Sequence, residues 1–182
     1  MLYVADDDVI NAFADSENIV INRGMMRFVQ SDEELALILG HELAHNARRH
    51  RRAKEWNAAM GAIGGLALDL LAVSAGVNTG GAFQDFGAGV GATLYSQEFE
   101  SEADYVGMYF TRRAGFDIEN VEDFWRRVAA EHPDAIRMAS THPTTAERFL
   151  RLGRTREEIL AKEAAGEPLI PNLREEAPRR AQ

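Results

Sequence analysis

The sequence contains no cysteine among its 182 residues. Disulfide bonds and thiolate metal sites are therefore excluded, while the redox compartment stays open. The length and an apolar fraction of 46% suffice for one sizeable hydrophobic core. We therefore expect a single catalytic domain over residues 1–165, followed by a C-terminal tail over residues 166–182.

The chain also lacks an excess of positive charge, because 20 Lys and Arg stand against 29 Asp and Glu and give a formal net charge of −9. A surface that binds nucleic acid phosphates is usually basic overall, so we expect no nucleic acid partner. One local run, Ala47 to Lys54, is basic. It falls where a helix that starts near Ser31 would end, and cations there complement the helix dipole. A patch for an anionic surface is the alternative explanation.

A signal peptide is not evident, because the opening "MLYVADDDVINAF" has no basic segment before an apolar core. Leu2 to Ala5 is typical of a strand, yet nothing precedes it. We therefore expect the chain to be the catalytic part of a longer precursor, truncated at its N-terminus.

Short extended segments and then helices are predicted along the chain. Residues 2–30 contain two or three extended runs, of which Asn18 to Asn22 alternates best and precedes a turn at residues 22–24. Ser31 is expected to cap a helix that continues to His50, with Glu34 completing a capping box. Residues 58–95 are rich in glycine and alanine. Further helices are predicted over residues 96–114, over 121–131 and after Thr144.

The motif "HELAH" lies within the first of these helices. His41 and His45 are four residues apart, so their rings leave the same helix face and can grip one ion. Zinc suits neutral imidazoles and activates a bound water, from which Glu42 would take a proton. A chance pair of histidines on a solvated face is the alternative.

A catalytic zinc needs a third protein ligand. For the same segment to supply this ligand, position 48 would have to be glycine and position 51 histidine. The chain has Arg48 and Arg51 there, and His50 is out of register. Glu100 and Asp104 lie four apart on a later helix, where the first can bind the metal and the second can accept a ring N–H from a ligand histidine. Gly107 on the same face permits close helix packing. The alternative is a solvated acidic face that also includes Glu98 and Glu102.

Three segments in this order, "HELAHNARRH", "SQEFESEADYVG" and "STHPTTAERF", resemble the HtpX-like and CAAX-prenyl-protease type of zinc metallopeptidases, which are gluzincins. The resemblance covers roughly residues 11–152. It implies an α+β, zincin-like fold that is mostly helical around the HExxH helix. It also implies a small N-terminal antiparallel or mixed β-sheet whose edge strand lies over the cleft. The family pattern places its glutamate ligand at Glu100 and its buried aspartate at Asp104.

The resemblance also assigns roles near the zinc to two later residues. His142, in the "THP" motif, would either stabilise the tetrahedral intermediate or occupy the fourth metal position; a solvent-exposed turn is the alternative. Arg148 would fix that loop or a carboxylate. The soluble members of the family imply a bacterial periplasm or cell envelope location and a role in protein quality control.

The apolar stretch from Ala58 to Val77 is long enough to be considered as a membrane span. A single crossing would put His41 and Glu100 on opposite sides of the bilayer, and the following segment is too polar for a second crossing. Asp69 also interrupts the stretch. We therefore expect a buried or cleft-covering helical hairpin, with peripheral membrane contact still possible.

The sequence thus predicts a zinc-dependent endopeptidase with one zinc per chain, acting on unfolded or misfolded proteins. The substrate would lie extended along an edge strand formed by Asn18, Ile19, Val20, Ile21 and Asn22. The alternative is a chaperone-like module that binds chains, with a structural zinc or with a cleft closed by a glycine-rich lid over residues 79–92. His142 as a fourth ligand would separate these readings. The oligomeric state is not defined by the sequence.

Overall fold

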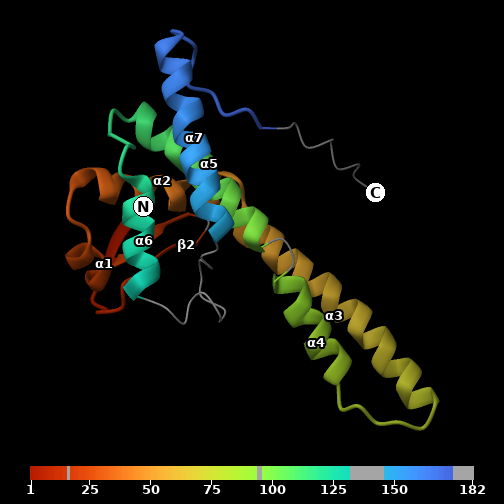
Figure 1. The fold of residues 1–182 in the computed structure, drawn as a ribbon. Helices are drawn as coiled ribbons and strands as arrows, with labels where there is room; N and C mark the ends of the chain where they lie inside the picture. The colour runs from red at the N-terminus through yellow and green to blue at the C-terminus, as the bar shows by residue number, and fades with distance from the viewer. Residues whose placement is uncertain (16, 94–95, 132–145, 174–182) are drawn as a thin grey trace.

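The computed structural model describes residues 1–15, 17–93, 96–131 and 146–173 (Figure 1). These residues form a mostly helical structure with a small sheet, so the predicted α+β, zincin-like class is confirmed. In chain order the elements are β1 (Leu2–Ala5), β2 (Ala12–Ala14), β3 (Ile19–Asn22), α1 (Arg23–Phe28), α2 (Asp32–Ala47), α3 (His50–Ser74), α4 (Ala82–Thr93), α5 (Ser96–Arg113), α6 (Val121–Glu131) and α7 (Ala146–Ala164).

The three strands form a mixed sheet in the order β1-β3-β2. β1 runs parallel to β3, with Leu2 opposite Ile19, and β2 runs antiparallel to it, with Phe13 opposite Val20. The mixed sheet is as predicted, but the prediction that Asn18 to Asn22 forms the edge strand is wrong. β3 is the central strand, because the chain start pairs along its other side. Alternation of side chains identifies a strand but not its place in a sheet.

The turn predicted at residues 22–24 is also wrong, because α1 begins there. Gly24 packs against the backbone of Asp8 so closely that a Cβ at this position would collide with it. Arg23 and Arg27 pair with the neighbouring Asp8 carboxylate, each at 2.9 Å. The acidic loop before β2 therefore holds this short helix in place.

Helix α2 packs directly on α5, and small residues set their separation. Ser31 caps α2 as predicted, accepting a hydrogen bond from the Glu34 amide. A Cβ on Gly107 would lie 2.8 Å from the backbone nitrogen of His41, and a Cβ on Gly40 would lie 2.6 Å from the Gly107 carbonyl oxygen. This confirms that Gly107 permits close packing. It brings the face of α2 that carries His41 and His45 against the face of α5 that carries Glu100.

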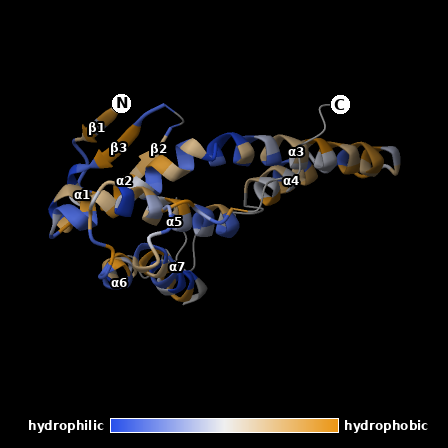
Figure 2. Ribbon diagram, turned by 90° about the horizontal axis from the view of Figure 1, so that it is seen from above, coloured by the Kyte–Doolittle hydropathy of each residue, from blue (hydrophilic) through white to orange (hydrophobic). Residues whose placement is uncertain are grey.

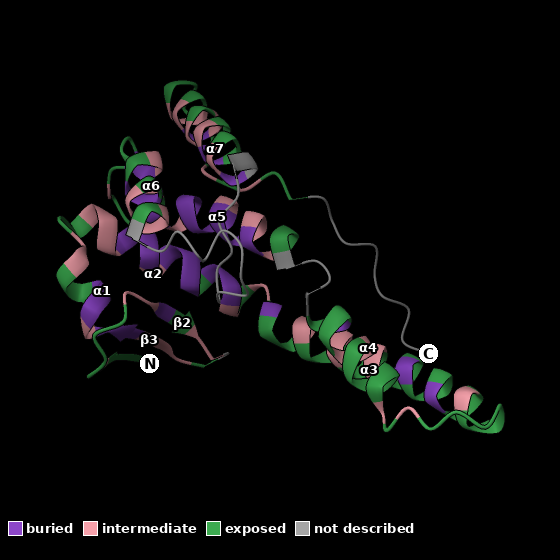
Figure 3. Ribbon diagram, turned by 60° about the horizontal axis from the view of Figure 1, so that its bottom comes forward, coloured by how far each residue is buried: buried purple, intermediate pink, exposed green. Residues whose placement is uncertain are grey.

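The main hydrophobic core lies between α2, α5, α6 and α7 and beneath the sheet. Tyr109, Ile118, Phe124 and Ile159 are completely buried in it. The helices predicted from residues 96, 121 and 144 onward appear as α5, α6 and α7. Together they form the body of the molecule around α2 (Figure 3).

Helices α3 and α4 pack together as a hairpin that projects from this body (Figures 1 and 3). The predicted hairpin is confirmed, but the expectation that it is buried or covers the cleft is wrong. Only 11% of the most apolar 18 residues of α3 are buried. Among the described residues, α3 is the one helix long and apolar enough to cross a membrane.

Candidate metal centre

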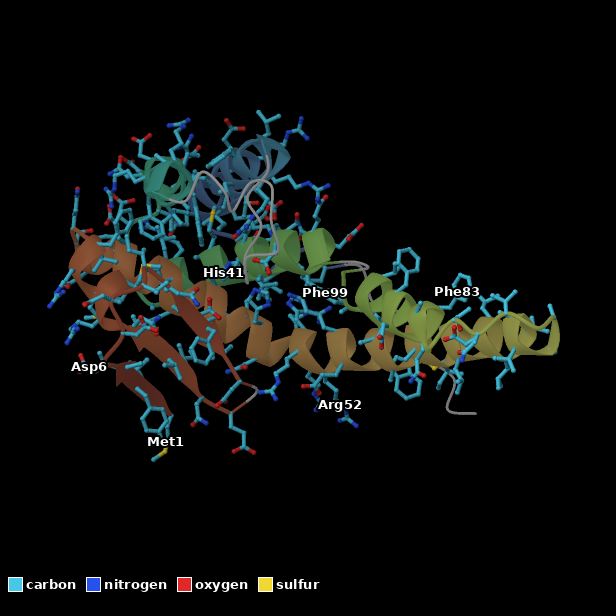
Figure 4. The ribbon with its side chains drawn as sticks, turned by 90° about the horizontal axis from the view of Figure 1, so that it is seen from below. Met1, Asp6, His41, Arg52, Phe83 and Phe99 are labelled. Carbon is cyan, nitrogen blue, oxygen red and sulfur yellow. The ribbon has the colours of Figure 1, made fainter. Side chains whose placement is uncertain are left out.

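The face of α2 that packs on α5 carries both histidines of the HELAH motif, of which Figure 4 labels His41. The Nε2 atoms of His41 and His45 lie 3.0 Å apart, and both side chains are buried. Their spacing of four residues places the rings one helical turn apart, as the sequence indicates. Each ring therefore directs the same nitrogen to one point.

Helix α5 supplies a third donor at this point. One oxygen of Glu100 lies 3.3 Å from His41 Nε2, and the other lies 3.5 Å from His45 Nε2. Glu100 is completely inaccessible to solvent. Tetrahedral zinc with bonds of 2.0–2.1 Å places its ligand atoms about 3.3 Å from one another. Two imidazoles and a carboxylate at these separations therefore fit a zinc ion.

His41 is held from behind by a buried carboxylate. Its Nδ1 donates to Asp104 Oδ1 at 3.0 Å. Arg148 in turn donates to both Asp104 oxygens, at 2.8 and 2.9 Å, and lies over the Trp125 ring. Burial favours the neutral carboxyl, but the Arg148 guanidinium and His41 hold the pKa of Asp104 below its usual value. This arrangement fixes the ring so that Nε2 faces the other donors.

His45 is held in a similar way by His50, which sequence analysis had set aside as out of register. His45 Nδ1 lies 2.9 Å from His50 Nδ1, and the other nitrogen of His50 lies 2.9 Å from Glu102 Oε2. His50 is buried and stacks on Phe99. These contacts are all satisfied when His45 Nδ1 donates to His50 Nδ1 and His50 Nε2 donates to the Glu102 carboxylate. Glu102 therefore does not belong to the solvated acidic face.

His50 reaches this position because the helix predicted from Ser31 to His50 is broken. α2 ends at Ala47, and Arg49 adopts a left-handed conformation with φ of 57° before α3 begins. On a continuous helix His50 would point away from His45. The one signal in the sequence was that His50 lies at the predicted end of the helix. A break in the helix there changes the direction in which the His50 ring points.

We expect Glu102→Ala to lower zinc affinity roughly 10- to 100-fold, because the ring of His50 would lose its acceptor and His45 its fixed orientation. Glu98→Ala is the matched control: Glu98 is exposed on the same helix, and its loss should leave the affinity unchanged. Titration with a competing zinc chelator measures both. Equal affinities for the two variants would contradict this role for Glu102.

The charge of the centre predicts a pH dependence. Burial lowers the pKa of His41, but the carboxylates of Asp104 and Glu100 outweigh it and raise this pKa to about 10. The metal-free site therefore carries a proton on His41 at pH 7, and a metal that needs neutral imidazole must displace it. We expect zinc binding to release about one proton, with affinity rising about tenfold per pH unit from pH 6 to 8. Calorimetry in buffers of different ionisation enthalpy measures the release; a flat affinity above pH 7 would contradict it.

The remaining predicted site residues are placed as follows. Glu42 follows His41 on α2 and is 2% exposed. Asn18 accepts a hydrogen bond from the Asn46 side chain, which links the start of β3 to α2. His142 lies outside the described residues. The proposed lid over residues 79–92 is wrong, because most of that segment is α4, which packs along α3 and away from the histidines.

An HExxH helix packed on a second helix that contributes a buried glutamate defines a metallopeptidase of the zincin-like class. Residues 1–156 match the model of peptidase family M48, and the chain belongs to this family. Members of the family depend on a metal, typically zinc.

The chain is also similar to individual named proteins. The beta-barrel assembly-enhancing protease of Yersinia pestis is 31% identical over 78% of this chain and 31% of its own length. Its putative counterpart in Vibrio cholerae is 32% identical over 81% of this chain and 32% of its own length. The mitochondrial metalloendopeptidase OMA1 of Schizosaccharomyces pombe is 29% identical over 83% of this chain and 45% of its own length. The chain thus spans less than half the length of these relatives.

Proposed function

We propose that the chain is the catalytic domain of a zinc-dependent endopeptidase that hydrolyses peptide bonds in unfolded or misfolded proteins. The observation that carries this proposal is the buried convergence of His41, His45 and Glu100, with Glu42 beside them on α2. These three residues would hold a single zinc, and three protein ligands are the number that catalytic zinc sites use.

The chain's own residues divide the chemistry among them. Bound zinc would supply a Lewis acid that polarises the scissile carbonyl and lowers the pKa of water. Glu42 takes the proton from the attacking water and returns it to the leaving amine. Asp104 keeps the ring of His41 in one tautomer and orientation through Nδ1. The low exposure of the cluster excludes bulk solvent and strengthens these interactions.

The sheet supports an extended substrate. β2 and β1, and not β3, are the edge strands, and β2 is the edge that packs against α2, which carries the histidines. A chain that adds to this edge would be selected by main-chain hydrogen bonds and so by its lack of folded structure. The names of the bacterial relatives refer to β-barrel assembly. Because such barrels belong to outer membranes, we place this chain in a bacterial periplasm or cell envelope.

Metal removal tests this function. The purified chain is expected to cleave unfolded casein, to lose this activity after dialysis against a zinc chelator, and to regain it with about one equivalent of zinc. A tightly folded protein of similar size is the control substrate and should remain intact. Cleavage that persists in the chelated sample, with zinc shown to be absent, would contradict the proposal.

A further inference from the structure

The hairpin of α3 and α4 exposes a large apolar surface that plays no part in the metal centre. Its outward side chains include Ile63, Leu66, Leu70, Leu71, Val73 and Phe86, of which Leu71 is 65% and Phe86 71% exposed. Figure 2 shows α3 changing from hydrophilic near α2 to largely apolar toward its far end. Soluble proteins rarely leave apolar side chains contiguous on this scale.

These side chains point outward because the two helices meet through glycines. Gly61 lies against the backbone of Gly87, and Gly65 against that of Phe83, so a Cβ at either position would collide. Gly91 approaches the Asn57 carbonyl in the same way. Such contact leaves no room for large side chains between the helices. Small residues four apart at a helix interface are typical of packing in lipid, where apolar burial between helices gains nothing.

The one acidic side chain near the hairpin tip is bonded within the hairpin. Asp69 is the only charged residue between Trp56 and Asp85, and it is 6% exposed. Its carboxylate accepts hydrogen bonds from the Thr79 hydroxyl and from the first amides of α4, including Gln84 at 2.8 Å. Because Asp69 bonds to the returning helix and does not face outward, it lowers the cost of placing this tip against hydrocarbon.

The exposed Asp85 limits how deeply the hairpin can insert. Since Gly61 packs on Gly87, Asp85 lies two residues nearer the tip, level with residue 63 of α3. Residues 63–74 extend about 16 Å beyond that level at 1.5 Å per residue. This length matches the acyl region of one leaflet, about 15 Å, and not a whole bilayer.

We propose that the hairpin tip, residues 63–83, inserts into one leaflet of a lipid bilayer. The apolar face of α3 is wide, because it spans roughly 140° around the helix from Leu66 through Ile63 to Leu71. A protein partner would cover a narrower face, whereas lipid surrounds the tip. The residues behind the tip suit the headgroup zone. The aromatic side chain of Trp56 is 62% exposed. Farther from the tip lies the exposed cation Arg52, which Figure 4 labels.

Flotation with vesicles of phosphatidylcholine and phosphatidylglycerol tests this insertion. The chain is expected to float with the vesicles, and Leu71→Glu is expected to weaken binding at least about tenfold. Leu150→Glu is the matched control, because Leu150 is 67% exposed but lies on α7 in the body. It should bind like the unchanged chain. Absence of flotation, or equal loss in both variants, would overturn the proposal.

A second readout reports where the chain meets the lipid. The chain has no cysteine, so Leu71→Cys and Leu150→Cys each accept a single environment-sensitive dye. On vesicle addition the dye at position 71 is expected to shift to the blue and the dye at position 150 to remain unchanged. A blue shift at position 71 that needs no vesicles and follows protein concentration, with a dimer in sedimentation, would show that a second copy covers the hairpin and would overturn the proposal.

Discussion

Glu42→Gln is expected to keep zinc and the fold while lowering cleavage of unfolded casein by roughly 10²- to 10⁴-fold or more. The amide nearly preserves the shape of the buried carboxylate, so the side chain still fits beside His41. It cannot accept the proton of the attacking water. Because the same group also returns that proton to the leaving amine, its loss affects both halves of the reaction.

Zinc content and activity are to be measured on the same preparations, so that an inactive enzyme is not mistaken for an empty one. Glu33→Gln makes the same chemical change in the first turn of α2 and should cleave like the unchanged chain. If Glu42→Gln were as active as the unchanged chain, the general base would be another group or the activity a contaminant. Chain binding without catalysis would then become the better explanation.

Glu100→Ala is expected to lower zinc affinity by more than about 100-fold, a larger loss than for residues that only hold a ligand in place. The carboxylate is the donor that α5 contributes, and it is completely buried beside both histidines. Asp104→Ala should weaken binding roughly 10- to 100-fold, because His41 remains but loses its fixed orientation.

Two control variants distinguish loss of a zinc ligand from loss of the fold. Glu100→Gln retains the volume of the side chain and is expected to weaken zinc binding while the circular dichroism spectrum stays unchanged. Glu98→Ala alters an exposed residue of the same helix and should leave the affinity as it was. An order in which Glu98→Ala loses more zinc than Glu100→Ala would refute the ligand assignment.

The parts of the site that follow helical spacing were predictable from the sequence. His41 and His45 share a face of α2, the Ser31 cap marks its start, and Gly107 allows α5 to approach. These are local properties of one helix or of its surface, so periodicity and capping determine them. The structure therefore places His41, His45 and Glu100 together as expected.

The features that sequence reasoning missed depend on tertiary geometry. A single left-handed residue, Arg49, turns the chain and moves His50 behind His45. The place of β3 at the centre of the sheet depends on pairing with residues at the chain start. The exposure of α3 follows from glycine contacts with α4, which composition alone does not reveal. His142 lies outside the described residues, and its role stays a prediction.

Anomalous X-ray scattering at the zinc absorption edge, from crystals of the chain grown with one equivalent of zinc, tests the central claim most directly. We predict one strong peak bound by Nε2 of His41, Nε2 of His45 and an oxygen of Glu100, at about 2.0–2.2 Å, with one position left for water or substrate. A site without a peak, or zinc held by His50 and Glu102 instead, would contradict the account.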